Sequence, residues 1–159
     1  KPDFKDYINS VLANAKILSE TLKNNGFKIY SGGTDTHLML VDLRPFNVKG
    51  NLAAESLSRA NITCNKNGIP FDSESPMITS GIRLGSQAAT TRGFGLKEFE
   101  KVGELITKVI DGLSKNPNDN SKIEDEVRKE VVSLCSSFPI YKNLRKWFAQ
   151  YAKKEKLQL

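Results

Sequence analysis

The sequence predicts an α+β fold, a two-layer sandwich in which helices cover a small, mainly antiparallel sheet. Two observations predict it. Four long segments carry apolar residues at the three- and four-residue spacing of amphipathic helices. Between them lie short apolar runs in pairs, separated by glycine, asparagine and proline, which is typical of strands joined by turns. The order along the chain is helix, two strands, helix, two strands, helices.

The predicted helices have recognisable ends. The first begins near Asp3, because a carboxylate suits a helix N-terminus, and it stops at Asn24-Asn25-Gly26, where glycine permits a left-handed cap. The last begins with the capping-box pattern Ser121-Lys122-Ile123-Glu124 and ends at Pro139. We therefore predict four helices, at residues 3–24, 50–60, 96–113 and 121–138.

The predicted strands are four short segments, at residues 27–30, 38–41, 62–65 and 78–84. The turn Ser31-Gly32-Gly33-Thr34-Asp35 separates the first two. It lacks the lysine and the following helix of a phosphate-binding loop, so a hairpin connection is the better interpretation. Asn65-Lys66-Asn67-Gly68 is predicted to be a polar turn of the Asn-Gly type. His37, beside the first turn, is expected to make structural hydrogen bonds rather than to act as a base.

The length of 159 residues fits one domain. We divide it into a linker helix at 1–26, an α+β domain at 27–141 and a basic amphipathic extension at 142–159. The net charge of +6 is concentrated at the end, since residues 141–159 hold six cations and one acid, or +5. The remaining 18 cations and 17 acids give the domain only +1.

Composition excludes several classes of protein. Two cysteines make no disulfide framework, so a reducing, cytoplasmic location is expected. With a single histidine, no metal site is expected. No apolar run reaches the length of a membrane span. The chain begins at Lys1-Pro2 without a methionine, which suggests a segment of a longer protein.

The last predicted strand suggests an anion-binding site. Side chains alternate along a strand, so Ile82 and Leu84 should face the core and Arg83 the opposite side, between Gly81 and Gly85. The two glycines are expected to leave open space above the guanidinium. Its planar fork can bind a carboxylate through two hydrogen bonds. The alternative is a surface strand with a bulge and a solvated arginine.

Several motifs surround this strand in a fixed order. They are Ser31-Gly32-Gly33-Thr34-Asp35-Thr36-His37-Leu38 with Val41-Asp42, Arg59-Ala60-Asn61-Ile62-Thr63-Cys64-Asn65-Lys66-Asn67, Ser75-Pro76, Thr79-Ser80-Gly81-Ile82-Arg83-Leu84-Gly85 and Thr91-Arg92-Gly93-Phe94. In this order and spacing they resemble the serine hydroxymethyltransferase family, over roughly residues 4–141. The resemblance is to the C-terminal small domain of these fold-type I pyridoxal phosphate enzymes.

The resemblance implies an enzyme that interconverts serine and glycine, with pyridoxal phosphate as cofactor and tetrahydrofolate as the one-carbon carrier. It also implies a homodimer, with no nucleic-acid or membrane partner. In the family the Schiff-base lysine follows a Thr-rich stretch that ends in His-Lys, whereas the only histidine here precedes Leu38. This chain alone is therefore expected to be inactive, and no catalytic residue is assigned within it.

Carried over by position, the resemblance implies that Arg83 binds the carboxylate of glycine or serine. Arg92 is implied to support the site without touching the ligand. Met77 stands where the family commonly has phenylalanine, so an aromatic ring is missing from this position. Contacts to folate are implied at four positions: Asn67, Ser75, Pro76 and Met77.

The extension at 142–159 leaves a different class of function open. Its lysines, with Trp147, Phe148 and Tyr151 at helical spacing, would suit a stand-alone module that binds nucleic acid or an anionic surface. An amphipathic helix that docks its aromatic side chains on the domain is the simpler interpretation. Steeply salt-dependent binding to an oligonucleotide would distinguish the two.

Overall fold

The computed structural model describes residues 2–140, so the predicted extension at 142–159 lies outside the described residues. The helices are α1 (Pro2–Asn24), α2 (Gly50–Arg59), α3 (Gln87–Arg92), α4 (Leu96–Lys115) and α5 (Ser121–Ser136). The strands are β1 (Lys28–Ile29), β2 (Leu38–Asp42), β3 (Asn65–Asn67) and β4 (Gly81–Gly85). Two short 3-10 turns, η1 (Tyr30–Gly32) and η2 (Arg44–Phe46), follow β1 and β2.

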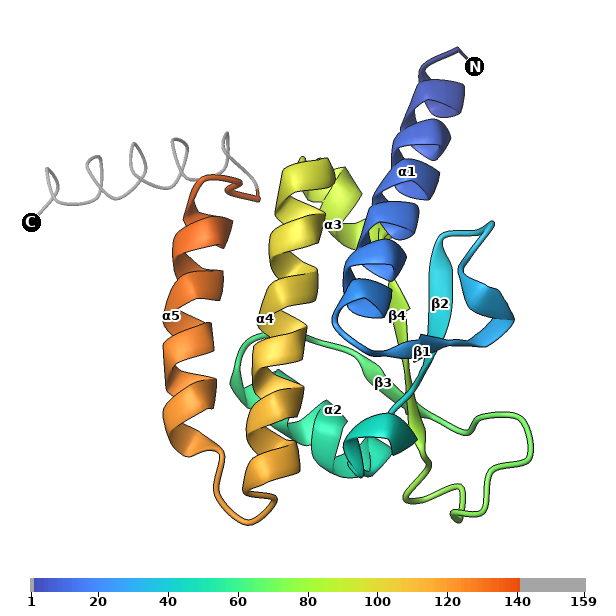
Figure 1. Ribbon diagram of the computed structural model, residues 1–159. Coiled ribbons are helices and arrows are strands. Elements are labelled where there is room, and N and C mark those ends of the chain that lie inside the picture. The colour runs from blue at the N-terminus through green and yellow to red at the C-terminus, as the bar shows by residue number, and fades with distance from the viewer. Residues whose placement is uncertain (1, 141–159) are drawn as a thin grey trace, which may run out of the picture.

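The strands form one sheet in the order β1-β2-β4-β3, and each neighbouring pair runs antiparallel. The turn between β1 and β2 joins adjacent strands, which confirms the predicted hairpin. Helix α2 connects β2 to β3, and β4 lies between these two strands, so the central unit is a split β-α-β arrangement. Figure 1 shows the helices gathered on one side of the sheet. The predicted two-layer α+β sandwich is confirmed.

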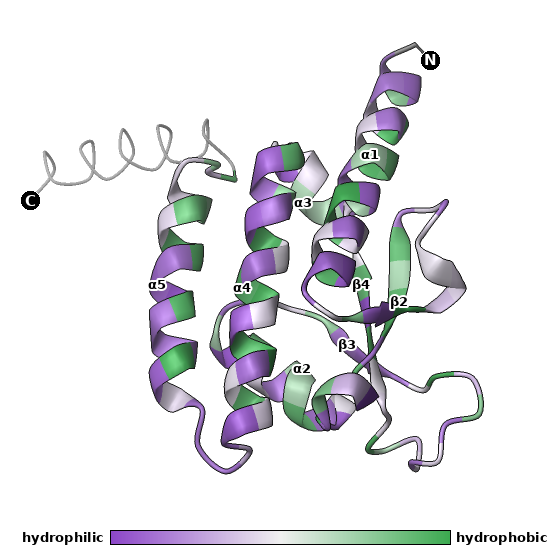
Figure 2. Cartoon of the chain, viewed as in Figure 1, coloured by the Kyte–Doolittle hydropathy of each residue, from purple (hydrophilic) through white to green (hydrophobic). Residues whose placement is uncertain are grey.

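The core lies between the sheet and the helices. Helix α4 is central, with α1 on one side and α5 on the other (Figure 1). Helix α1 comes close to α4 at Gly103, where an added Cβ would lie 2.7 Å from Cγ2 of Thr21. Apolar and polar residues form separate stripes along the helices, as Figure 2 shows by colour, and the buried residues are mostly apolar. The largest fully buried side chains include Leu18, Leu22, Leu57, Ile82, Phe99, Leu105, Ile106 and Ile110.

Helix α1 belongs to this core although the sequence suggested a linker. Ala15, Leu18 and Leu22 of α1 are buried in the same cluster as the residues of α4. The helix ends at Asn24, and Gly26 just after it has a φ of 88°, the left-handed conformation expected there. The division of the chain at residue 26 stays a prediction.

Two local predictions are wrong. The strand predicted at 62–65 and the turn predicted after it are displaced: residues 62–64 are not in a strand, and Asn65–Asn67 is β3, because these residues pair with β4, with Lys66 opposite Ile82. The predicted capping box at Ser121 does not form either. Helix α5 already includes Ser121, and the side chain of Glu124 turns inward to bind Ser56 and Arg59 instead of capping the helix. Tertiary partners outweighed the local pattern in both cases.

Helix α3 and the two 3-10 turns were not predicted. Helix α3 has only six residues, of which Thr90 and Thr91 are β-branched, so it lacks the periodic apolar pattern of a long helix. No helix within residues 2–140 combines the length and the apolar character that crossing a membrane requires.

Candidate functional site

Arg83 lies on the face of the sheet that points away from the helices. Its neighbours in β4, Ile82 and Leu84, are buried, whereas Arg83 is exposed, so the predicted alternation is confirmed. Across the sheet Arg83 is opposite Leu40 of β2 on one side and Asn65 of β3 on the other. The backbone of Arg83 is therefore held in place by strand pairing on both sides.

Within residues 2–140, Arg83 makes no hydrogen bond or ion pair. A carboxylate shares this face of the sheet, since Asp42 lies opposite Gly81. Arg44 already binds it through its guanidinium, with Nε donating to Oδ1 at 3.0 Å and Nη2 to Oδ2 at 2.7 Å, and through its backbone N–H, which donates to Oδ1 at 3.0 Å. Burial alone would raise the pKa of Asp42, but the hydrogen bonds and charge of Arg44, aided by Lys28, hold that pKa below its usual value. Asp42 is thus occupied, and Arg83 remains available to an anion from outside.

The space beside Arg83 differs from the prediction. A Cβ on Gly81 would lie 2.6 Å from Cγ2 of Ile69, and one on Gly85 would lie 2.7 Å from Oε1 of Gln87. The two glycines therefore admit neighbouring side chains and do not leave open space. Ile69 is buried, and its side chain covers Gly81 beside Arg83.

The four predicted folate positions lie at and beyond the edge strand β3. Asn67 is on the same face as Arg83, since it is opposite Gly81, and its side-chain amide donates to the carbonyl of Gly68 at 2.7 Å. The other three, Ser75, Pro76 and Met77, are exposed in the connection from β3 to β4. Nζ of Lys66 donates to the carbonyl of Met77 at 2.5 Å, which brings this connection beside β3.

Comparison with known proteins finds relatives of one family. The family model described as serine hydroxymethyltransferase matches residues 1–106. A serine hydroxymethyltransferase of Pelagibacter ubique is 88% identical over 145 residues, which are 91% of this chain and 33% of that protein. One of Marinomonas sp. is 61% identical over 142 residues, or 89% of this chain and 33% of that protein.

The chain belongs to the serine hydroxymethyltransferase family. It spans about a third of the length of the curated relatives that it matches. The comparisons give no support to the alternative of a nucleic-acid or anionic-surface binding module. The residues on which that alternative rested, 142–159, are outside the part of the chain that the structure describes.

Arg92 of this family member contacts the end of α5. Its Nε donates to the carbonyl of Phe138 at 2.7 Å and its Nη2 to that of Cys135 at 3.0 Å. A cation at a helix C-terminus satisfies free carbonyls and is favoured by the helix dipole. The contact visible here is therefore structural, and the implied support of the ligand site by Arg92 stays a prediction.

Sequence reasoning did not single out Asn65, which the structure places beside Arg83. This exposed side chain lies directly opposite Arg83, where its amide can both donate and accept hydrogen bonds. It was missed because residues 65–68 were interpreted as a turn. The alternation of Asn65, Lys66 and Asn67 was the signal that could have shown two amides on one face of a strand.

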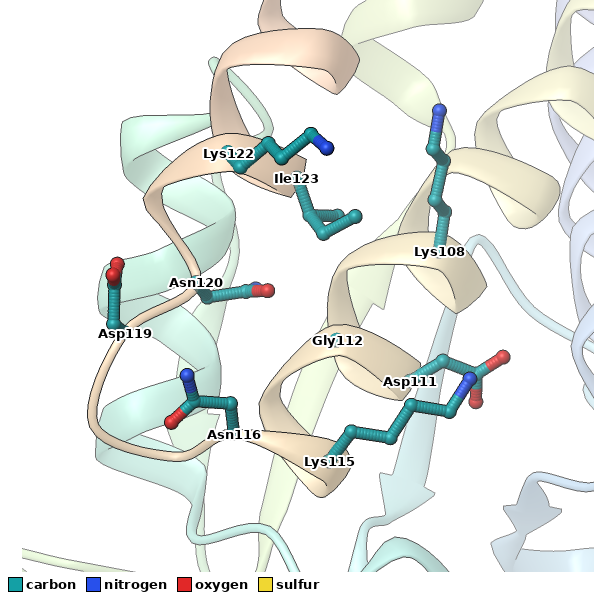
Figure 3. A pocket seen from close by; sticks show the side chains of 9 residues that line it. All are labelled: Lys108, Asp111, Gly112, Lys115, Asn116, Asp119, Asn120, Lys122 and Ile123. Carbon is teal, nitrogen blue, oxygen red and sulfur yellow. The ribbon is translucent and has the colours of Figure 1, made fainter.

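Other features of this family member offer less chemistry. A polar hollow between α4 and α5 is framed by Lys108, Lys115 and Lys122 (Figure 3). Its buried Asn120 already donates to Ser56 and to the carbonyl of Val109.

Burial raises the pKa of the Cys64 thiol to about 11, which disfavours the nucleophilic thiolate. The described residues contain no group of three or more metal-binding side chains.

Proposed function

We propose that this chain is the C-terminal part of a serine hydroxymethyltransferase and supplies its carboxylate-binding arginine and part of its folate site. The whole enzyme would interconvert serine and glycine, with tetrahydrofolate as the carrier of the one-carbon unit. The observation that carries the proposal is Arg83, an exposed guanidinium on a paired strand, without a partner within residues 2–140, in a chain of this family.

Arg83 would hold the amino acid by its carboxylate. Two parallel N–H donors of the guanidinium match the two carboxylate oxygens, so the contact fixes orientation as well as position. The strand backbone around Arg83 is paired on both sides, which limits how far its Cα can move. A carboxylate held in this way places the rest of a small amino acid in one direction, as a reaction at its α-carbon requires.

Asn67 and residues 75–77 would contact folate. The amide of Asn67 uses one N–H on Gly68 and keeps a second N–H and its oxygen for a heterocycle edge. Ser75 adds a hydroxyl, and Pro76 and Met77 add apolar surface; Met77 is 74% exposed. This combination of polar edge and apolar surface suits a flat, partly aromatic ligand.

Pyridoxal phosphate would be held by residues outside this chain. The donors that β3 and β4 place on the Arg83 face are one guanidinium and the amides of Asn65 and Asn67, which suit a carboxylate and a heterocycle edge. Lys28 and Arg44 lie near the same face, and both are already engaged by Asp42. They include no lysine in the family's His-Lys pattern, since the only histidine precedes Leu38. These residues do not fit the cofactor's ring and phosphate, so this chain would act on the substrates alone.

We expect the whole protein to be a cytoplasmic homodimer, as the family resemblance implies.

Replacing Arg83 in the full-length enzyme tests the proposal. Arg83→Ala should weaken glycine binding by about 2–4 kcal/mol, because two charge-assisted hydrogen bonds are lost. Arg83→Lys keeps the charge but not the fork and should also be impaired. Glycine affinity is measured from the change in cofactor absorbance, and thermal melting reports folding.

Arg128→Ala serves as the control, since Arg128 is an exposed arginine of α5 that pairs with Asp125. It should leave glycine binding unchanged. Unaltered glycine affinity in Arg83→Ala would refute the assignment. Lost affinity together with a collapsed melting temperature would point to a structural arginine instead.

A further inference from the structure

The connection from β3 to β4 is long for two neighbouring antiparallel strands. Residues 68–80 contain no helix or strand, whereas hairpin loops usually have about 2–5 residues. This connection carries positions 75–77 of the proposed folate site. An exposed loop can present side chains in one geometry only if something in the fold holds it.

Asp72 holds this loop at both ends. Its Oδ2 accepts hydrogen bonds from the backbone N–H of Ile69 at 3.1 Å and of Ser80 at 2.9 Å. Its Oδ1 accepts from the N–H of Glu74 at 3.0 Å and from Oγ of Ser80 at 2.6 Å. Ile69 comes just after β3 and Ser80 just before β4, so one carboxylate joins the two ends of the loop.

The hydrogen bonds of Asp72 favour its ionised carboxylate. Partial burial opposes ionisation, but the hydrogen bonds from Ser80, Glu74 and Ile69 outweigh it and hold the pKa of Asp72 far below its usual range. The two residues that Asp72 joins, Ile69 and Ser80, meet at the first residue of β4. Ser80 directly precedes Gly81, and the side chain of Ile69 packs over that glycine.

The far half of the loop is fastened to α2. Glu74 forms an ion pair with Lys49, and the carbonyls of Ile78 and Thr79 accept the first N–H groups of α2, from Asn51 and Gly50, both at 2.9 Å. Positions 75–77 therefore lie between two fixed points, the Asp72–Glu74 contact and the start of α2. Asp72 provides the fixed point nearer to β3.

Phe71 indicates that the backbone beside Asp72 is constrained. This residue is fully exposed and has a φ of 57°, a left-handed conformation that a bulky side chain rarely adopts. Such a conformation persists only where the surroundings determine it. The side chain of Phe71 makes no buried packing that could do so. Two hydrogen bonds span it instead: the carboxylate of Asp72 accepts from the N–H of Ile69, and the N–H of Asp72 donates to the carbonyl of Ile69 at 3.0 Å.

We propose that Asp72 is a positioning residue for folate, which holds residues 75–77 in place through the loop backbone without touching the ligand. The folate part of this inference rests on the proposed function, whereas the four hydrogen bonds of Asp72 are independent of it.

The test is Asp72→Asn in the full-length enzyme. An amide of the same shape has one acceptor oxygen, so half of the hydrogen bonds lose their acceptor. We expect the KM for tetrahydrofolate to rise by about tenfold or more, since a loosened loop misplaces its contacts. Glycine affinity should change by less than about twofold, because Arg83 lies in the paired strand. Asp35→Asn, at an exposed aspartate of the first turn, is the matched control and should change neither.

Hydrogen exchange on the full-length enzyme tests, without an activity assay, whether Asp72 holds the loop. In Asp72→Asn the amides of residues 69–80 should exchange about tenfold faster or more, while those of α4 stay unchanged. If Asp72→Asn does not fold, Ser80→Ala removes only the hydroxyl donor, and the same two changes should appear with smaller size.

An unchanged KM for tetrahydrofolate would overturn the inference. So would a loss of folate and glycine binding in equal measure with a lowered melting temperature, since that is the result of general destabilisation. If the wild-type enzyme does not use folate, the proposed function fails. Hydrogen exchange of residues 69–80 then tests by itself whether Asp72 holds the loop. Unchanged exchange in residues 69–80 would refute the role of Asp72 in holding the loop.

Discussion

Gly81 and Gly85 flank Arg83 symmetrically in the sequence, yet a methyl group would meet different surroundings at the two positions. At Gly81 the neighbours are Cγ2 of the buried Ile69 at 2.6 Å and the backbone oxygen of Val41 at 2.7 Å. At Gly85 the closest atom is the amide end of Gln87. A backbone oxygen in a paired strand cannot withdraw, whereas the end of a flexible side chain can.

We therefore expect Gly81→Ala to destabilise the chain by about 1–3 kcal/mol, as overpacking of a firm site does. Gly85→Ala should cost less than about 1 kcal/mol, because Gln87 can rotate away. Urea unfolding of the two variants measures both values. Equal losses of stability would show that Ile69 and the backbone at Gly81 adjust as easily as Gln87 does.

At the scale of elements, a buried carboxylate joins α2 to α5. Glu124 of α5 is 4% exposed and accepts from Oγ of Ser56 at 2.6 Å and from Nε of Arg59 at 2.7 Å. Hydrogen bonds from Arg59 lower the pKa of Glu124 despite its burial, and Ser56 adds to the effect. A carboxylate with a lowered pKa in the folded state contributes stability above its unfolded pKa and loses it as the pH falls through the folded value.

Glu124→Gln should accordingly destabilise the chain at pH 7 by about 1–3 kcal/mol, the range for hydrogen bonds to a charged group. The difference from the wild type should shrink as the pH falls below the ordinary glutamate value of 4.5. Urea unfolding between pH 7 and pH 3 measures it, with Glu20→Gln, on the exposed side of α1, as the control. A difference that does not depend on pH would mean that shape, rather than charge, holds the two helices together.

At the scale of the whole molecule, α1 and α4 share one core, so residues 2–140 should unfold as one unit. Leu18 of α1 is 2% exposed and lies in the same cluster as Ile106 of α4. Leu18→Ala should cost about 2–4 kcal/mol, as large-to-small changes in a core do. Far-UV and near-UV circular dichroism should then report a single, coincident transition.

Leu12→Ala is the matched control on the same helix, because Leu12 is 38% exposed and should cost less than about 1 kcal/mol. Equal, small effects of the two variants, or an early separate loss of helix signal, would show α1 to be a detachable linker.

The sequence by itself determined the fold class, the four long helices, the hairpin and the exposed side of Arg83. These features depend on the period of apolar residues and on glycine at turns, which are properties of neighbouring residues. Motifs such as Thr79–Gly85 also indicated the family, since their order and spacing are properties of the chain alone.

Only the tertiary structure decided that residues 65–67 form an edge strand, that Glu124 turns inward and that Ile69 fills the space above Gly81. Each depends on a partner distant in the sequence: Arg83 for Asn65, Ser56 for Glu124 and Gly81 for Ile69. Asp72 is the same case, since its four hydrogen bonds have meaning only once the two strands meet. A local pattern records what a residue prefers among its neighbours, whereas packing determines which distant group it meets.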